Sequence, residues 1–415
     1  MNRVTDQENI VMRNWIVWTC ALVILGGVPT FSSAQEKKTD GKTRSNPFGF
    51  SLKVSASTTD NRDSTATAEE SNTDIKVSPR ADGRIERPGT LLEFYYSPTY
   101  RYRSDPSLGE DDNELYHDIG ANLDHEFSER FRIELRDFYN VTEDPAIVSG
   151  GGTLRQDGAY FLNRIQGLAS YLLTKSVYVD LRVDHRLKEY DSAGAAANLD
   201  EEAASASLTV WRQVRDDTAV LAEVEVGAYE FDSTSAIRDF DRVQGVIGVH
   251  RVLGNGMHAG ARVGITEIDH DDTTLGSESS PFVSATLSSD SRAKTRLRLG
   301  AGLELRDSDV APFASQEHTH LTASLEHVVS KKIKLLGGVQ YRVSEYDEVP
   351  SGLAGVVRGG DEDLVAVHGG VEYQLDNRQK IKAEASHQDL SSDVDVGTNR
   401  DYDRTTGTVT WQMKL

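Results

Sequence analysis

The chain holds a single cysteine, Cys20, among its 415 residues, and it lies within the first 34. Everything after that position lacks a thiol, which excludes disulfides, cysteine-ligated metals and cysteine nucleophiles. Proline is scarce as well, at ten residues. No segment carries apolar residues at the sustained 3.6-residue spacing of an amphipathic helix, which argues against a helical fold.

Basic residues are outnumbered, with 45 Lys and Arg against 66 Asp and Glu, for a formal net charge of −21. With no Lys/Arg-rich patch, this balance excludes nucleic acid as a partner. The mean hydropathy of −0.47 argues against transmembrane helices. It does not argue against a transmembrane barrel, because a barrel strand presents only alternate residues to lipid.

The N-terminal region contains one apolar run, residues 15–26, which follows Arg13 and precedes the small residues Ser32-Ser33-Ala34. This order predicts a signal peptide over 1–34 that is cleaved after Ala34, with Met12 as an alternative start. The run is too short for a membrane anchor. A lipoprotein would need small residues just before Cys20, where Trp18 stands instead. We therefore expect export from the cytoplasm, with a polar tether over 35–47.

A strict alternation of apolar and charged residues begins after the tether. Residues 177–191, VYVDLRVDHRLKEYD, place valine and leucine on one face and charged residues on the other. The segment is longer than the usual strand of about 5–6 residues and suits a membrane-spanning barrel strand. Similar segments predict eighteen strands in a barrel over 48–415, with sixteen as the alternative because 73–79 and 281–288 are short. The predicted strands lie near 48–57, 73–79, 90–103, 114–126, 131–141, 159–172, 177–190, 203–214, 218–231, 240–252, 257–269, 281–288, 295–307, 317–329, 333–346, 363–375, 380–390 and 404–415.

The connections between these strands alternate in length, which predicts an all-β, antiparallel up-and-down barrel of the transmembrane type. A propeller would need four short strands in each repeat of similar length, and here there are two long ones. We expect the barrel to close by pairing 48–57 with 404–415. Among the long loops, 142–158 is the best candidate for one that folds into the lumen. The short connections are 128–130, 174–176, 215–217, 253–256, 330–332 and 376–379, and the long ones are 58–72, 142–158, 191–202, 270–280 and 347–362.

The charged face must meet water, because an Arg or Lys at the bilayer midplane costs about 2–4 kcal/mol. In TRLRLGAGLELRD (295–307) we expect the leucines, Leu305 included, to face lipid. The mixed charges of the opposite face could bind a polar solute, or they could merely pair across strands. Tyr95, Tyr96, Tyr100 and Tyr102 are expected to include residues of an interfacial aromatic girdle. The lumen-lining candidates are Asp180, Arg182, Asp184, Arg186, Glu223, Glu225, Arg296, Arg298, Glu304 and Arg342.

The final residues, TVTWQMKL (408–415), form an alternating strand of the kind that ends outer-membrane barrels, with Leu415 where phenylalanine is usual. Together with NRDYDR (399–404), TTDNRDST (58–65) and DIKVSPR (74–80), it resembles the family called putative β-barrel porin type 2. The resemblance implies a Gram-negative outer-membrane location, contact with outer-membrane lipid, and recognition of the C-terminal strand by the barrel insertion machinery.

The same resemblance implies a role in exopolysaccharide export with periplasmic export proteins as partners. Two alternatives stay open. The first is a diffusion porin for small polar solutes, and the second is a structural or adhesive barrel with a plugged lumen.

No enzymatic constellation stands out, since no GxSxG motif occurs. His318 and His320 share a strand face, as a metal pair requires, but no carboxylate cluster near them in sequence completes a site. The acidic stretches 269–272 and 359–363 could hold Ca²⁺, although solvated loops are the preferred interpretation. We therefore expect no catalytic residue, no cofactor and no metal.

Overall fold

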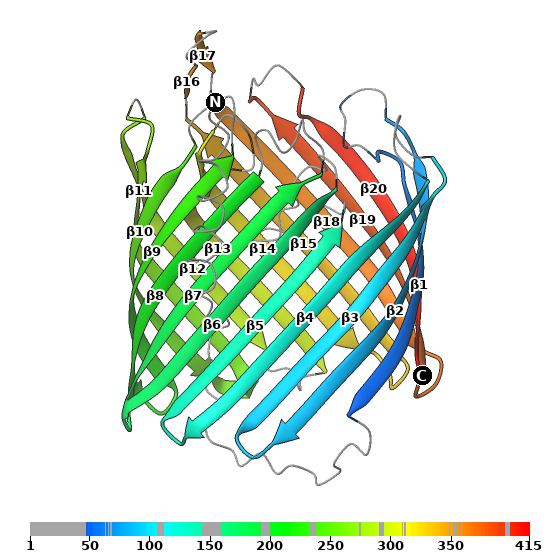
Figure 1. Cartoon of the computed structure of the whole chain (residues 1–415), viewed down its shortest axis with the longest axis horizontal. Coiled ribbons are helices and arrows are strands. Elements are labelled where there is room, and N and C mark those ends of the chain that lie inside the picture. The colour runs from blue at the N-terminus through cyan, green and yellow to red at the C-terminus, as the bar shows by residue number, and fades with distance from the viewer. Residues whose placement is uncertain are drawn as a thin grey trace, which may run out of the picture.

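The computed structural model describes residues 47–415 except 63, 65, 67–68, 106–111, 143–158, 192–199, 233–237, 274, 290–293, 309, 311–312, 348, 352–354, 358 and 395–398. Its main element is one 18-stranded antiparallel sheet that closes on itself as a barrel of steeply tilted strands (Figure 1). The prediction of eighteen alternating strands is confirmed. The predicted signal peptide and nearly all of the tether lie outside the described residues.

Each barrel strand runs 12 to 16 residues, as the length of the alternating segments predicts. Two of them, β2 and β12, are longer than predicted, at 16 and 13 residues. The strands are β1 (Phe48–Thr59), β2 (Asn72–Arg87), β3 (Thr90–Arg103), β4 (Asn113–Ser128), β5 (Phe131–Thr142), β6 (Tyr160–Thr174), β7 (Val177–Tyr190), β8 (Asp200–Arg215), β9 (Thr218–Asp232), β10 (Phe240–Leu253), β11 (Met257–His270), β12 (Ser277–Ser289), β13 (Thr295–Asp307), β14 (Ser315–Val328), β15 (Ile333–Tyr346), β18 (Gly360–Gln374), β19 (Gln379–Ser392) and β20 (Tyr402–Lys414).

The barrel closes between its first and last strands. β1 pairs antiparallel with β20 from Ser51 opposite Lys414 to Thr59 opposite Thr406, so the predicted closing pair is confirmed. Every other strand pairs with its neighbours in the closed order. A closed ladder leaves no row of unpaired N–H and C=O groups facing lipid.

The connections differ at the two ends of the barrel, as predicted. At the lower end in Figure 1 they are two to four residues long where described, for example Pro88-Gly89 and the 3-10 turn Gly254–Gly256. At the upper end they have six residues or more. The connection after β15 contains a small hairpin, β16 (Val349–Ser351) and β17 (Gly355–Val357), which projects beyond the barrel.

The two faces of the wall differ in chemistry. Val365, Val367 and Val371 of β18 expose about two fifths of their surface on the outer face. Aromatic side chains mark its two rims, with Phe48, Phe50 and Phe127 toward the short turns. No helix among the described residues is long and apolar enough to cross a membrane.

The tyrosines of β3 divide between the two faces. Tyr96, Tyr100 and Tyr102 are exposed on the outer face, where a girdle residue belongs. Tyr95 instead points into the lumen, where the Arg80 guanidinium lies 3.7 Å from its ring centroid and its hydroxyl donates to Asp118 at 2.8 Å. Three of these four tyrosines therefore have the outer-face exposure that a girdle residue requires, and Tyr95 does not.

Neighbouring positions on β18 test the assignment of faces. Replacing Val367 with Arg should cost about 2–4 kcal/mol near the midplane, because the guanidinium would enter hydrocarbon. Ala366→Arg, one residue away, should fold far better because its side chain enters the aqueous lumen. Heat-modifiable gel mobility after refolding into lipid vesicles measures the folded fraction, and equal losses in both variants would contradict the assignment.

Candidate functional site

Strand β13 leaves the barrel wall near the upper end. Its pairing with β12 runs only from Ser288 opposite Arg298 to Val283 opposite Leu303, although both strands continue beyond that point. Pro281 of β12 lies at the break, and proline has no N–H to donate to a ladder. β13 stays paired with β14 as far as Asp307 opposite Ser315. The end of β13 and the described residues of its connection to β14 therefore turn inward together, while β14 stays paired with β15 as far as Glu317. We call the described residues of Glu304–His318 the inward segment.

Apolar packing seats this segment against the inner wall. Leu305 is fully buried, in one cluster with Phe231, Phe240, Ile268 and Ala314. Register places Phe240 and Ile268 on the lumen faces of β10 and β11. The expectation that Leu305 faces lipid is therefore wrong. Alternation assigns a face only while a strand remains in the wall, and β13 has left it at this point.

Arg238, just before β10, clamps the tip of the inward segment. Its Nε donates to the Phe313 carbonyl and its Nη2 to the Ser308 carbonyl, both at 2.8 Å. Its guanidinium lies 4.3 Å from the Phe231 ring centroid. On the opposite side, Phe313 packs against Tyr346 of β15, with ring centroids 5.1 Å apart. The segment thus contacts walls on both sides of the barrel mouth.

An ion pair ties the segment to a distant strand. Asp307 of β13 lies 3.0 Å from Arg186 of β7, and five strands stand between these two in the sheet. Arg186 also bonds Glu201 of β8. Since no lateral neighbour relation joins β7 and β13, this contact crosses the lumen. The described residues of the inward segment therefore narrow the opening at this end of the barrel. The predicted inward loop, 142–158, lies almost wholly outside the described residues.

The ten predicted lumen residues all lie on the polar face that the strand register defines. Most of them have a charged partner there, as the pairing interpretation expects. Their ion pairs are Asp184–Arg164 at 2.8 Å, Arg186–Glu201, Glu223–Arg262 at 3.6 Å, Glu225–Arg242 at 3.4 Å, Arg296–Glu326 at 3.1 Å and Glu304–Arg306 at 3.9 Å. Asp180 instead accepts hydrogen bonds from Ser170 and Trp211.

The side chains of the remaining three, Arg182, Arg298 and Arg342, form no ion pair or hydrogen bond with the described part of the chain. Arg182 borders a lumen cavity of about 230 Å³ that also meets Arg262, His250 and Phe282. Its floor includes Trp211, which is 2% exposed and stacks on Tyr178 with centroids 6.0 Å apart. A guanidinium beside an apolar surface suits a solute with an anionic group and an apolar body.

Sequence analysis missed this apolar part of the lumen. Trp211, Leu221 and Val246 form a buried cluster on the lumen faces of β8, β9 and β10. Each interrupts the polar side of an alternating segment. These three side chains lie at the same height on adjacent strands. Only the strand register shows this, and the sequence alone does not provide that register.

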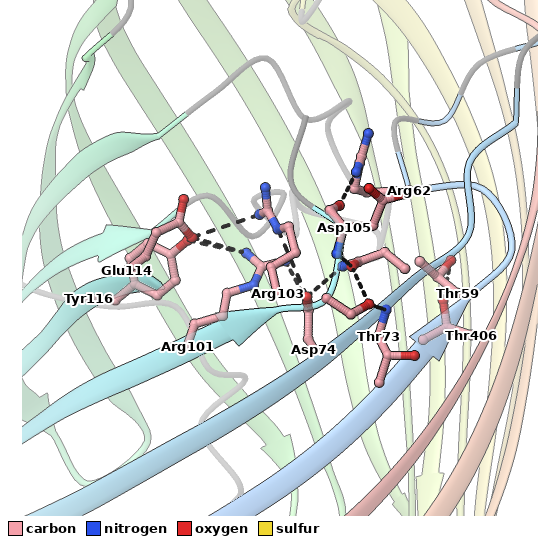
Figure 2. A network of polar contacts seen from close by, with 12 residues as sticks. Thr59, Arg62, Thr73, Asp74, Arg101, Arg103, Asp105, Glu114, Tyr116 and Thr406 are labelled. Carbon is pink, nitrogen blue, oxygen red and sulfur yellow. Dashed lines mark hydrogen bonds and ion pairs between the residues drawn. The ribbon is translucent and has the colours of Figure 1, made fainter. Parts of the chain in front are cut away.

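A second polar network lies at the mouth near the closing strands. Figure 2 shows Arg101 and Arg103 of β3 between Asp74 of β2 and Glu114 of β4. Arg101 Nη2 donates to Asp74 Oδ2 at 2.5 Å, and Arg103 is almost fully buried. Two arginines facing two carboxylates balance their formal charge, so this network connects β2, β3 and β4 at the mouth.

Carboxylates gather outside the wall break between β12 and β14. Glu278 accepts a hydrogen bond from Ser315 at 2.7 Å, and Glu317 accepts one from Ser280. Burial, and after it the charges of Glu278 and Glu317, raise the pKa of the Asp347 carboxyl beyond the end of β15. These side-chain bonds connect β12 to β14 where the backbone ladder to β13 has ended.

Comparison with known proteins agrees with this architecture. The family model described as putative beta-barrel porin 2 matches residues 198–415, more than half of the chain. The chain belongs to that family. The resemblance noted in its terminal strands is thereby confirmed, and the family and the closed 18-stranded fold assign this porin 2 barrel to the outer membrane.

Solved structures with similar folds are outer-membrane channels. OpdK from Pseudomonas aeruginosa, crystallised with vanillate, is 11% identical with a TM-score of 0.50, covering 89% of this chain and 99% of its own. A BenF-like porin from Pseudomonas fluorescens Pf-5 is 10% identical, with a TM-score of 0.48 and coverage of 89% and 99%. At such identities the likeness concerns the fold alone. No curated protein matches the chain in sequence.

Removing the Arg238 clamp should loosen the inward segment without unfolding the barrel. Arg238→Met leaves two buried carbonyls without their donor, which costs about 1–3 kcal/mol for each unsatisfied group. Hydrogen exchange in nanodiscs should then accelerate at the Ser308 and Phe313 amides, which bond Ala314 and Val310 within the segment.

Arg251→Met serves as the control, because Arg251 forms an exposed ion pair with Asp217 at the opposite end of the barrel. Exchange at Ser308 and Phe313 should stay unchanged in that variant. Unchanged protection in both variants would show that Arg238 does not hold the segment.

Proposed function

We propose that this porin 2 barrel is a passive channel that admits small polar solutes through the outer membrane and excludes large ones at the inward segment. The observation that carries the proposal is the Asp307–Arg186 ion pair, which holds β13 against the lumen face of β7 at 3.0 Å. An 18-stranded barrel is wide enough for an aqueous channel. A segment tied across its mouth reduces the size of solute that can pass.

The wall chemistry supports a polar solute. Paired charges line most of the lumen, so a hydrated solute meets alternating donors and acceptors over its path. Arg182 and Arg262 border the cavity of about 230 Å³, and Arg182, which has no ion-pair partner in the described part of the chain, adds positive charge there. Such a surface favours small solutes that carry a carboxylate over neutral ones of equal size.

Export of an exopolysaccharide, which the family resemblance implies, stays a prediction. A polymer would need the inward segment to withdraw, breaking the Arg238 and Arg186 contacts together. A plugged, purely structural barrel is the other alternative. Delivery by a signal peptide over 1–34, insertion through the C-terminal strand and partnership with periplasmic export proteins belong to the same set of proposals, and no enzymatic activity is proposed.

Liposome swelling with uncharged sugars of increasing length tests the size limit. Wild-type barrels should pass monosaccharides and disaccharides and slow sharply for longer oligosaccharides. Asp307→Asn combined with Arg238→Met should raise the rate for the longer sugars several-fold, because both attachments of the segment are removed. The control Arg84→Gln, at an exposed lumen pair with Glu93, should change the profile little.

The alternatives predict different results. A wild-type barrel that passes no sugar of any size supports the plugged barrel. Loss of surface polysaccharide in a strain lacking the gene, with normal uptake of small solutes, supports export. Either result would overturn the proposed channel.

A further inference from the structure

Two histidines and a carboxylate meet at the base of the inward segment. Register sets Glu304 of β13 directly opposite His318 of β14, and His320 follows two residues along on the same face. Their ligating atoms all lie within 4.8 Å of one another. The sequence offered only the histidine pair, since Glu304 lies fourteen residues before His318 in the chain. The fold thus brings to the histidine pair a carboxylate that lies far from it in the sequence.

We propose that Glu304, His318 and His320 form a binding site for a divalent transition-metal ion such as Zn²⁺, which joins β13 to β14 where β13 leaves the wall. The donor set of two imidazoles and one carboxylate is the kind that binds Zn²⁺ with a fourth position open. This inference concerns a metal site and does not depend on the proposed channel function.

The distances allow a metal after small side-chain rotations. His318 Nδ1 lies 3.7 Å from Glu304 Oε1. Ligand atoms about 2.0–2.2 Å from a tetrahedral Zn²⁺ lie roughly 3.3–3.5 Å from one another. The pair is therefore within a few tenths of an ångström of that spacing. The wider separations in the cluster, up to 4.8 Å, close by rotation of the imidazoles.

Gly302 has no side chain and so leaves room for the His320 imidazole. The imidazole covers this glycine, and a Cβ added there would lie 2.5 Å from His320 Cε1. His320 Nδ1 is buried and has no hydrogen-bond partner in the described part of the chain. His318 is 1% exposed, so the site is largely shielded from bulk water.

Two neighbouring arginines limit the affinity. Arg306 Nη1 lies 3.9 Å from Glu304 Oε1, and Arg306 Nη2 lies 3.8 Å from Asp307 Oδ1. Arg342 is opposite His320 in the register. Their positive charge opposes a cation, so we expect reversible binding and not a permanently held structural ion.

His368 provides a matched comparison. Its imidazole covers Gly338 in the same way, with a Cβ at Gly338 lying within 2.9 Å of His368 Nε2. It lies on the lumen face of β18, and the described residues gather no group of three metal-ligating side chains around it. A variant at His368 therefore removes a lumen histidine without touching the proposed site.

Isothermal titration of Zn²⁺ into the purified, metal-free barrel in detergent tests the proposal, with excess Mg²⁺ present to occupy acidic loops. Wild type should bind one Zn²⁺ per chain in a saturable manner. His320→Gln and Glu304→Gln should each weaken binding at least tenfold, and His368→Gln should leave it unchanged. Titration with Co²⁺ should give ligand-field absorption in wild type that His320→Gln abolishes.

Two outcomes would overturn the metal site. The first is the absence of saturable binding in wild type. The second is binding that persists in the double variant His318→Gln/His320→Gln, which would place the ion elsewhere. If the buried His318 variant fails to fold, Gly302→Ala decides instead, because its Cβ displaces the His320 imidazole and should also weaken binding.

Discussion

The structure depends on one constraint: within hydrocarbon, every backbone N–H and C=O must find its partner inside the protein. Eighteen strands meet this constraint by closing on themselves through β1 and β20. The inward turn of β13 also satisfies this constraint on the backbone groups. Thr295 to Leu303 supplies nine wall residues before the ladder to β12 ends. A barrel strand needs about 9–11 residues to cross the bilayer, so β13 turns inward only at the far side.

Beyond that point, side chains replace the backbone ladder. Glu278 with Ser315, and Ser280 with Glu317, connect β12 to β14 across the place that β13 has left. The freed strand end brings apolar and charged groups into the mouth together. Leu305 supplies packing against the wall and Asp307 supplies an ion pair to Arg186 of β7, six strands away in the sheet. The same departure that narrows the channel also brings Glu304 to His318 and His320.

Much of this architecture was predictable because alternation is a local property. Strand positions, loop asymmetry and the closing pair followed from it. β2 was underestimated because Ala81 and Gly83 give its outer face little apolar signal, and Phe94 of β3 covers Gly83 in the fold. β12 was underestimated because Pro281 resembles a strand start. Leu305 was assigned to lipid because alternation cannot show where a strand leaves its sheet.

The candidate sites were less predictable, since they join residues from different strands. The alternation of residues along each strand predicted which charged side chains face the lumen. Identifying the partner of each charge required the strand register. The cluster of Glu304 with His318 and His320, the apolar patch at Trp211 and the pair Asp307–Arg186 all depend on contacts that no single segment contains. Sequence patterns predict well which face of a strand each residue occupies. They say little about which side chains of distant strands come into contact across the lumen.

The central claim is that the end of β13 lies inside the barrel. Methyl NOE spectroscopy on the protein in lipid nanodiscs tests it most directly, through the methyl groups of Leu305. The account predicts cross-peaks from Leu305 to the Phe240 ring or the Ile268 methyls, and none to lipid acyl chains. Cross-peaks from Leu305 to acyl chains, without contact to Phe240 or Ile268, would place β13 in the wall along its whole length and contradict the account.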